Sequence, residues 1–282
     1  MYRAKRERLG WAAYRPELDG AAEVRLRDIA ELRTALSERQ LRLHYQPVVP
    51  AQPELSGGPA VVEALVRWQH PRRDLLLPAV FLPLASQTGL MLELSAVVLD
   101  LALRDNASWR RRGLDVQVAV NVGADVLASD GFVALVLDLL TEHGVPAERL
   151  CLELTESEVL SAEGAELLTR VRAAGVAVAL DDFGTGYSSL SSLADLPLDR
   201  LKFDQSFVRR LSSGAHGARL VTGLVRLVHD LECPIVAEGV ETDAELRLLA
   251  DLGVEWVQGY AVSRPLTPEH LVSWLDPGDP PA

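Results

Sequence analysis

Short apolar runs rich in Val, Ile and Leu recur along this chain, and they alternate with longer stretches whose apolar positions follow helical spacing. Continuous apolar runs of this length are typical of strands that are buried on both faces. The pattern predicts eight strands, at Leu43–Val49, Val61–Trp68, Val116–Val122, Leu150–Thr155, Val176–Asp181, Arg200–Phe203, Ile235–Ala237 and Glu255–Gln258. Eight such strands alternating with helices over about 240 residues favour a TIM-like (β/α)8 barrel, an α/β fold with a closed parallel barrel inside a layer of helices. An open doubly wound sheet is the alternative, although it usually has fewer strands.

Capping signals support the helices that this pattern predicts. The spacing of apolar residues predicts a first helix over Val24–Gln40. Thr242 and Glu245 have the spacing of a capping box at the start of a later helix. Thr267 followed by Pro268 predicts the N-cap and the first residue of the last helix.

Composition is that of an ordinary globular protein. The chain has 282 residues, of which 48% are hydrophobic and 24% charged, so a single core needs no disulfide or metal for folding. No apolar stretch is long enough for a membrane span, and no secretory signal follows Met1. The only cysteines, Cys151 and Cys233, lie far apart in apolar runs, which suits a reducing cytoplasm. We therefore expect a cytoplasmic location.

The charge distribution limits the partners of this chain. Net charge is −12, and the excess of acidic residues lies entirely beyond residue 42. Such a surface repels extended nucleic acid, whereas a small phosphate ligand held through metal ions remains compatible with it. Among the 28 basic residues only Lys5 and Lys202 are lysine. Lys202 lies inside an apolar run, so either it is an ordinary surface lysine or its compact charge has a chemical role.

Polar side chains that can bind a metal or a polar ligand lie at or near the end of nearly every predicted strand. They are Gln46, Glu63, Asn121, Glu153, Glu156, Asp181, Asp182, Lys202, Asp204, Glu238, Glu241 and Gln258. In a (β/α)8 barrel the chemistry takes place at the carboxyl ends of the strands. Glu63 and Glu153 are the most informative, because an unpaired carboxylate inside an apolar strand is costly.

Several of these residues also have a purely structural interpretation. Glu156 and Glu241 could be first-turn residues that a helix dipole favours. Asn121 could be a turn residue, and Asp182 could be an N-cap. Taken together, however, several carboxylates that point into one barrel mouth repel each other unless cations bind there.

The donor types indicate which cations these would be. Carboxylate and amide oxygens without His or Cys suit Mg²⁺ or Mn²⁺ rather than zinc. The adjacent Asp181 and Asp182 are suited to bridging and flanking two ions, which is a standard arrangement for hydrolysis of phosphoesters. The segment that follows, residues 183–190, is interpreted as a Gly/Ser loop that covers the site, with an ordinary turn as the alternative.

Eight motifs, in order along the chain, resemble those of the EAL-domain cyclic-di-GMP phosphodiesterases. The resemblance extends from Val24 to Leu275. The motifs are Tyr45-Gln46-Pro47, Glu63-Ala64-Leu65 with Arg67-Trp68, Asn121-Val122, Glu153-Leu154-Thr155-Glu156, Asp181-Asp182-Phe183-Gly184-Thr185-Gly186, Lys202-Phe203-Asp204, Glu238-Gly239-Val240-Glu241 and Gln258-Gly259-Tyr260. Gly123 and Phe203 depart from the family's usual Ser and Ile, but neither is a proposed ligand.

The resemblance implies a TIM-like barrel, often a homodimer, that hydrolyses cyclic-di-GMP to the linear dinucleotide pGpG with two Mg²⁺ or Mn²⁺ ions. It implies that Lys202 orients or deprotonates the attacking water and that Glu156 anchors the Gly/Ser loop. One ion would be held by Glu63, Asn121, Glu153 and Asp181, and the second by Asp182 and Glu238 together with a bridging Asp181. The dinucleotide or the metal shell would be contacted by Gln46, Leu65, Arg67, Asp204, Glu241 and Gln258. Ca²⁺, with its looser coordination, is expected to bind and inhibit.

The resemblance also predicts how the chain divides. Residues 1–22 resemble the end of a GGDEF (diguanylate cyclase) domain, so we expect a linker or tail there and an EAL domain over residues 23–282. Upstream GGDEF or sensor domains, and a membrane anchor within them, would belong to the full-length protein.

Three other functions stay open on the sequence. A receptor that binds cyclic-di-GMP without hydrolysis shares the fold, but it has no need to keep every acid and Lys202. Dimerisation or partner docking could be the main role. A barrel enzyme that uses Mg²⁺ on an enolate shares the acids at the strand ends, but not the eight ordered motifs.

Overall fold

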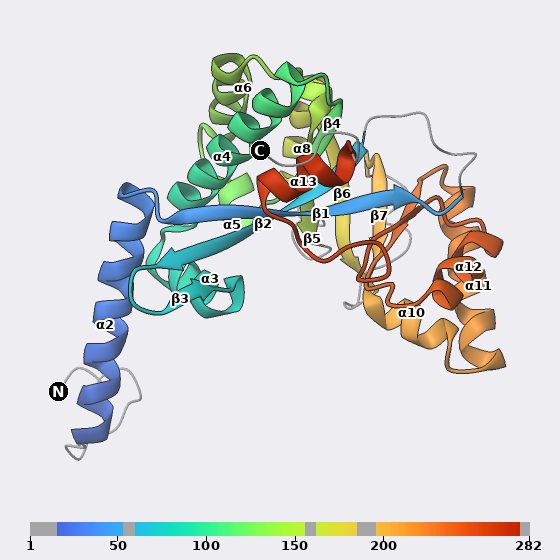
Figure 1. Cartoon of the computed structure of the whole chain (residues 1–282), viewed down its shortest axis with the longest axis horizontal. Coiled ribbons are helices and arrows are strands. Elements are labelled where there is room, and N and C mark those ends of the chain that lie inside the picture. Colours follow the sequence, from blue (N-terminus) through green and yellow to red (C-terminus); the bar gives the residue numbers. More distant parts are fainter. Residues whose placement is uncertain (1–15, 53–59, 156–161, 185–195, 277–282) are drawn as a thin grey trace.

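The sheet closes on itself as a barrel in a computed structural model that describes residues 16–52, 60–155, 162–184 and 196–276 (Figure 1). Eight strands form the ring in the order β1-β9-β8-β7-β6-β5-β4-β2, and a pairing of β1 with β2 closes it. A further strand, β3, extends β2 outside the ring. The strands are β1 (Leu41–Pro50), β2 (Ala60–His70), β3 (Asp74–Leu76), β4 (Val116–Asn121), β5 (Leu150–Thr155), β6 (Ala177–Phe183), β7 (Arg200–Phe203), β8 (Ile235–Ala237) and β9 (Trp256–Val257). The predicted TIM-like barrel is therefore confirmed.

The direction of one strand differs from the prediction of an all-parallel barrel. β1 is antiparallel to both of its neighbours, β2 and β9. The reason is the short connection between β1 and β2, residues 51–59, because parallel neighbours need a crossover of about a dozen residues or more. The antiparallel register sets Gln46 directly opposite Glu63. Gln46 thus reaches the site from the middle of its strand.

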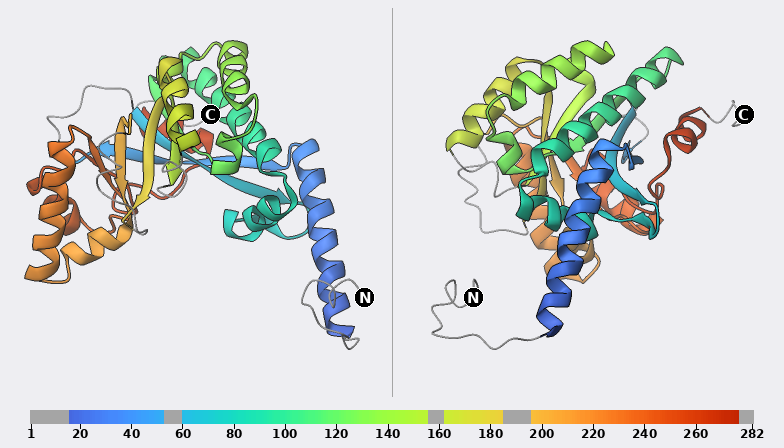
Figure 2. Two further views of the ribbon diagram at one scale, coloured as in Figure 1. Left: turned by 180° about the vertical axis from the view of Figure 1, so that it is seen from behind. Right: turned by 90° about the vertical axis from the view of Figure 1, so that its left-hand side faces the viewer.

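Helices surround the barrel on its outer side (Figure 2). They are α2 (Pro16–Ser37), α3 (Pro78–Thr88), α4 (Met91–Arg111), α5 (Ala124–Leu127), α6 (Phe132–His143), α8 (Ala162–Ala173), α10 (Gln205–Leu211), α11 (Ala215–Asp230), α12 (Asp243–Asp251) and α13 (Pro268–Leu275), with a 3-10 turn at Ala147–Arg149. Thr242 forms the predicted capping box with Glu245 at α12, and Thr267 caps α13. No helix in the described ranges is long and apolar enough to cross a membrane.

The first helix begins earlier than the sequence pattern indicated. α2 starts at Pro16, inside the segment predicted to be a linker, and a proline is well suited to a first helical position. In Figures 1 and 2 this helix extends away from the barrel. Its C-terminal half is anchored by Leu32, Ala35 and Leu36, which are buried in the main core.

The side chains inside the barrel change from small and apolar to acidic along the barrel axis. Ala119, Cys151 and Ala179 form a layer of small buried residues on β4, β5 and β6. Side chains alternate along a strand, so the residue two positions further on also faces inward. On β5 and β6 those residues are Glu153 and Asp181. The alternation thus directs these acids into the mouth of the barrel.

Candidate active site

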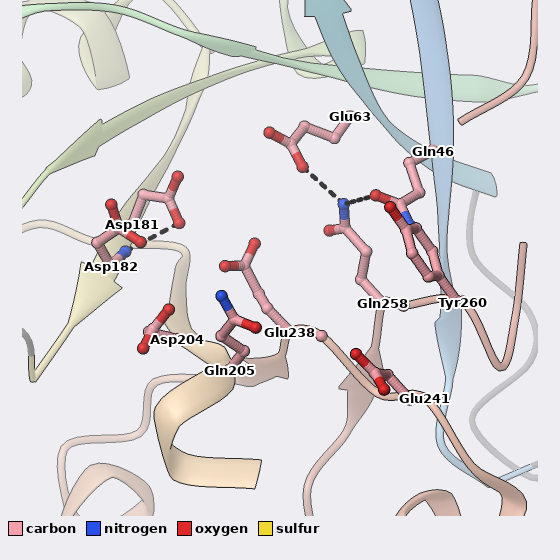
Figure 3. Close-up of a pocket in the computed structure, with 12 residues that line it drawn as sticks. Gln46, Glu63, Asp181, Asp182, Asp204, Gln205, Glu238, Glu241, Gln258 and Tyr260 are labelled. Carbon is pink, nitrogen blue, oxygen red and sulfur yellow. Dashed lines mark hydrogen bonds between the residues drawn. The ribbon is translucent and has the colours of Figure 1, made fainter. Parts of the chain in front are cut away.

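Carboxylates from separate strands gather at one end of the barrel (Figure 3). Glu63 of β2, Glu153 of β5 and Asp181 of β6 are buried, with 7%, 4% and 9% of their surfaces exposed. Glu238 directly follows β8 and lines the same cavity as Glu63 and Asp181. β2 and β4 to β9 run parallel to one another, so their carboxyl ends share one end of the barrel. This is the face on which barrel enzymes carry their chemistry.

An irregularity in β6 brings two consecutive aspartates into this mouth. Regular alternation would send Asp181 and Asp182 to opposite faces of the sheet. The pairing of β6 with β7 shifts register between Leu180 and Phe183, and Asp182 has a φ of 54°. A left-handed conformation in a residue other than glycine is a local strain that clusters at functional sites. Both aspartates line the cavity, and Asp182 lies inside β6 instead of at the start of a helix, so its interpretation as a helix N-cap is wrong.

Lys202 of β7 lies at the centre of the acidic cluster. Its Nζ is 2.7 Å from Glu238, 2.9 Å from Glu153 and 3.3 Å from Asp181. A fourth carboxylate, that of Glu63, is 3.7 Å away. Lys202 is 1% exposed, so the interpretation as an ordinary surface lysine is wrong. Burial disfavours the ammonium, but the surrounding carboxylates outweigh it and hold the pKa of Lys202 well above its ordinary value.

The carboxylates carry more negative charge than one ammonium can neutralise. Burial raises the pKa of Glu153 well above its ordinary value, and burial with the nearby Asp181 raises the pKa of Glu238 to about 7. Burial and Asp181 also raise the pKa of Asp182. For Glu63 burial acts in the same direction, but Lys202 and the amide donors outweigh it and lower the pKa. The cluster therefore favours protons or added cations.

The acids form two groups that could each hold a metal ion. One consists of Glu63, Glu153 and Asp181, and the other of Asp181, Asp182 and Glu238. Within each group the ligand atoms lie within 4.8 Å of one another, and Asp181 belongs to both. All of these donors are oxygens, as hard divalent cations such as Mg²⁺ and Mn²⁺ require.

Two amides complete the surroundings of Glu63. Asn121, at the end of β4, donates to its Oε1 over 2.8 Å, and Gln258 donates to its Oε2 over 2.6 Å. The same Gln258 Nε2 lies 3.1 Å from Oε1 of Gln46. Gln258 Oε1 is a buried acceptor with no hydrogen-bond partner among the described residues. A buried amide oxygen without a partner, close to carboxylates whose negative charge is not neutralised, fits a bound cation.

An open polar cavity of about 460 Å³ lies in front of the acids (Figure 3). Its lining includes four residues that the resemblance assigns to the dinucleotide or the metal shell, namely Gln46, Asp204, Glu241 and Gln258. Asp204 also accepts a hydrogen bond from the backbone of Ser206 and so caps α10.

A second cavity, of about 340 Å³ and mostly apolar, adjoins the site. Leu65 lines it together with Asn121 and Glu153, so it reaches the same acidic cluster. Arg67 is buried further along β2, where its Nη1 donates to the carbonyl of Val66 over 2.9 Å. The two cavities together offer a polar and an apolar compartment next to the carboxylates.

A family model identifies this arrangement. Residues 29–265 match the EAL domain. The chain belongs to the EAL domain family. The resemblance expected from the eight motifs is thereby confirmed.

Relatives of this EAL domain are known in Pseudomonas aeruginosa. The bifunctional diguanylate cyclase/cyclic di-GMP phosphodiesterase MucR is 41% identical over 97% of this chain, and the cyclic di-GMP phosphodiesterase PA2567 is 37% identical over 95%. The matched regions are 40% and 46% of those two proteins, so the chain spans less than half of either. The solved structure of a PaMucR phosphodiesterase in complex with c-di-GMP superposes with a TM-score of 0.81 at 41% identity, covering 87% of this chain and 99% of that one.

Parts of the predicted site lie outside the described residues. Glu156, the expected loop anchor, is outside the described residues, and the Gly/Ser loop beyond Gly184 is also outside them. Conversely, Gln205, Gly239 and Tyr260 line the cavity of this EAL domain without having been predicted to do so. Their place in the sequence could have indicated a role at the site, because each residue lies within or next to one of the eight motifs.

The raised pKa of Glu238 predicts that binding of a cation to this cluster depends on pH. A cation binds the ionised carboxylate, and below a pKa of about 7 the proton increasingly competes for it. We expect the affinity for Mn²⁺ to fall roughly tenfold between pH 8 and pH 6, measured by calorimetry on the wild-type chain. Glu238→Gln should weaken this dependence without abolishing it, because the pKa values of Glu153 and Asp182 are raised too, and equal affinities of the wild type at the two pH values would contradict the assignment.

Proposed function

We propose that this EAL domain hydrolyses cyclic-di-GMP to linear pGpG with the help of two Mg²⁺ or Mn²⁺ ions. The observation that carries the proposal is the pair of carboxylate groups that share Asp181 beside an open polar cavity. The names of two relatives and the solved c-di-GMP complex of one of them, MucR, supply the substrate class. A homodimer and an upstream GGDEF or sensor domain stay predictions.

The proposed ligands follow the two groups. Glu63, Asn121, Glu153 and Asp181 would hold one ion, and Asp182 and Glu238 would hold the second together with Asp181, which belongs to both groups. Bound cations neutralise the phosphate and lower the pKa of water, which is chemistry that the carboxylates alone lack. The irregularity in β6 contributes here, because it allows two adjacent aspartates to line one cavity.

Lys202 is proposed to act on the attacking water. Surrounded by carboxylates, its ammonium is a hydrogen-bond donor that orients a water or a phosphate oxygen. A role as a base requires the pKa of Lys202 to fall, and cations that compete for the same carboxylates would have that effect.

The polar cavity is proposed to receive guanine. The pairing edge of guanine presents an N–H and an NH₂ group as donors, and carboxylate oxygens accept from such donors. Asp204 and Glu241 bring carboxylates to the lining, while Gln46 and Gln258 bring amides. Leu65 in the second cavity offers apolar contact to a base, and Arg67 on the same strand supports Glu63 by its charge.

Product analysis tests this proposal. The purified chain is incubated with cyclic-di-GMP and Mn²⁺ in ¹⁸O-labelled water. The products are then separated, and their masses are measured by mass spectrometry. We expect pGpG with one ¹⁸O in its terminal phosphate and no product in EDTA. Binding of cyclic-di-GMP without any product would instead place the chain among non-hydrolysing receptors.

Calcium provides a second check on the two-ion geometry. Ca²⁺ accepts six to eight oxygen ligands in flexible arrangements, whereas Mg²⁺ demands a tighter octahedral shell. We expect Ca²⁺ to compete with Mn²⁺ for the acids and to reduce turnover by about a hundredfold or more. Initial rates in mixtures of the two ions measure this, and full activity in Ca²⁺ alone would argue against a strict geometry.

A further inference from the structure

Helix α10 lies against both of the segments that bring carboxylates to the second group alone. These carboxylates are Asp182, at the irregular end of β6, and Glu238, directly after β8. Side chains of α10 meet the backbone at Gly184, two residues after Asp182, and at Gly239, the residue after Glu238. The helix therefore contacts the chain just beyond each of the two carboxylates.

The first contact joins Gly184 to the ring of Phe207. Gly184 has a φ of 90°, which favours glycine, and a Cβ atom there would overlap the Cζ and Cε2 atoms of Phe207. Phe207 belongs to the main core and is only 6% exposed, so its ring cannot move aside without opening a gap. The backbone that follows Asp182 is therefore held directly against α10.

The ring of Phe207 belongs to a stack of three phenylalanines. Its centroid lies 4.7 Å from that of Phe203, with 17° between the ring planes, and 6.4 Å from that of Phe183. Phe203 stands where the family usually has isoleucine, which offers no flat face for such a stack. Phe183 and Phe203 pair across β6 and β7 just beyond the register shift. The stack thus supports the irregularity that brings Asp182 to the cavity.

The second contact holds the chain around Glu238. Gly239 has a φ of 66°, and a Cβ atom there would lie 2.5 Å from the Cβ of Gln205, the first residue of α10. On the other side, the backbone N–H of Glu238 donates to the carbonyl of Phe203 over 3.0 Å. Glu238 is therefore fixed between the end of β7 and the start of α10.

From these contacts we propose that Phe207 is a positioning residue, which through α10 holds Asp182 and Glu238 at the separation that the second ion requires. This inference rests on the proposed function, because it takes the second group as an ion site. Residues that orient metal ligands from behind typically change metal affinity by about 10- to 100-fold when they are replaced. Glu63 and Glu153 of the first group lie within β2 and β5, so the first ion should not depend on α10.

Metal binding to a Phe207 variant tests the inference. Phe207→Leu keeps an apolar side chain but loses the flat ring, so we expect the affinity for the second Mn²⁺ to fall by about tenfold or more in calorimetry at pH 8. The affinity for the first ion should stay unchanged. At limiting Mn²⁺ kcat should fall, and excess Mn²⁺ should restore it without a change in KM for cyclic-di-GMP. Leu211→Ala truncates another buried residue of α10 and is the matched control, which should lose stability but neither ion.

Amide hydrogen exchange in EDTA separates this inference from the proposed function. The N–H of Asp182 donates to its neighbour's carboxylate, Asp181 Oδ1, over 2.9 Å, and the N–H of Glu238 donates to β7. Both amides should exchange about tenfold faster or more in Phe207→Leu. The N–H of Val122, which donates to the carbonyl of Glu153 over 2.9 Å, should keep its rate.

The outcomes of this experiment are distinct. If the wild type binds fewer than two ions while faster exchange in Phe207→Leu is confined to Asp182 and Glu238, the two-ion site fails and the positioning role of Phe207 stands. Unchanged exchange of both amides in Phe207→Leu would overturn that role. Equal acceleration in Leu211→Ala would also overturn it, because it would point to a general loss of stability.

Discussion

Replacing Glu63 with glutamine is expected to reduce hydrolysis of cyclic-di-GMP by about a thousandfold or more. The glutamine has nearly the same shape, so it fills the buried position and its one oxygen can still accept from Asn121, although its NH₂ group cannot accept from Gln258. It cannot supply the negative charge that the first group of ligands contributes to a cation. The loss should therefore appear in turnover and in Mn²⁺ affinity, and not in folding.

Initial rates at saturating Mn²⁺ measure this effect. Glu142→Gln removes one negative charge from an exposed position on α6 and is the matched control, with an expected rate close to that of the wild type. Thermal unfolding in EDTA confirms that both variants are folded. Turnover by Glu63→Gln near the wild-type rate would show that this carboxylate holds no catalytic ion.

The second large effect concerns Lys202. Lys202→Met keeps much of the side-chain volume but removes an ammonium that lies within 4 Å of four carboxylates. We expect kcat to fall by about a hundredfold with affinity for cyclic-di-GMP largely retained, because the water loses its orienting donor. Without metal, the free energy of unfolding should fall by about 3 kcal/mol, since buried carboxylates lose their counter-charge.

Mn²⁺ distinguishes the two consequences of this substitution. Added Mn²⁺ should restore most of the lost stability, because the cations replace the missing positive charge, but it should not restore the rate. Denaturant unfolding with and without Mn²⁺ and steady-state kinetics give both readings. Collapse of cyclic-di-GMP binding in Lys202→Met would instead make Lys202 a phosphate contact.

The strands of the barrel were predictable because their apolar runs are continuous and regularly spaced. Strand direction was not, since an apolar run reads the same in either direction. Only the short connection at residues 51–59 indicates that β1 and β2 are antiparallel. β3 was missed because its three residues, Asp74–Leu76, are too few and too exposed to give a pattern.

The candidate site was predictable as a set of residues but not as a geometry. Carboxylates inside apolar strands identified Glu63 and Glu153, and the scarcity of lysine identified Lys202. That Asp182 faces the same way as Asp181 depends on the irregularity of β6 and on a positive φ, neither of which the sequence pattern reveals. Tyr260 gave no chemical signal by itself, because a single tyrosine after a glycine is common in loops.

The proposed hydrolysis depends on two cations that share Asp181, and counting bound Mn²⁺ tests this most directly. Equilibrium dialysis of the metal-free chain against Mn²⁺ at pH 8, followed by elemental analysis, gives the number of ions per chain. We expect the wild type to bind two ions and Asp182→Asn to retain one, because Asp182 belongs only to the second group of ligands. A wild-type chain that binds one ion or none, even with cyclic-di-GMP present, would contradict the two-ion site.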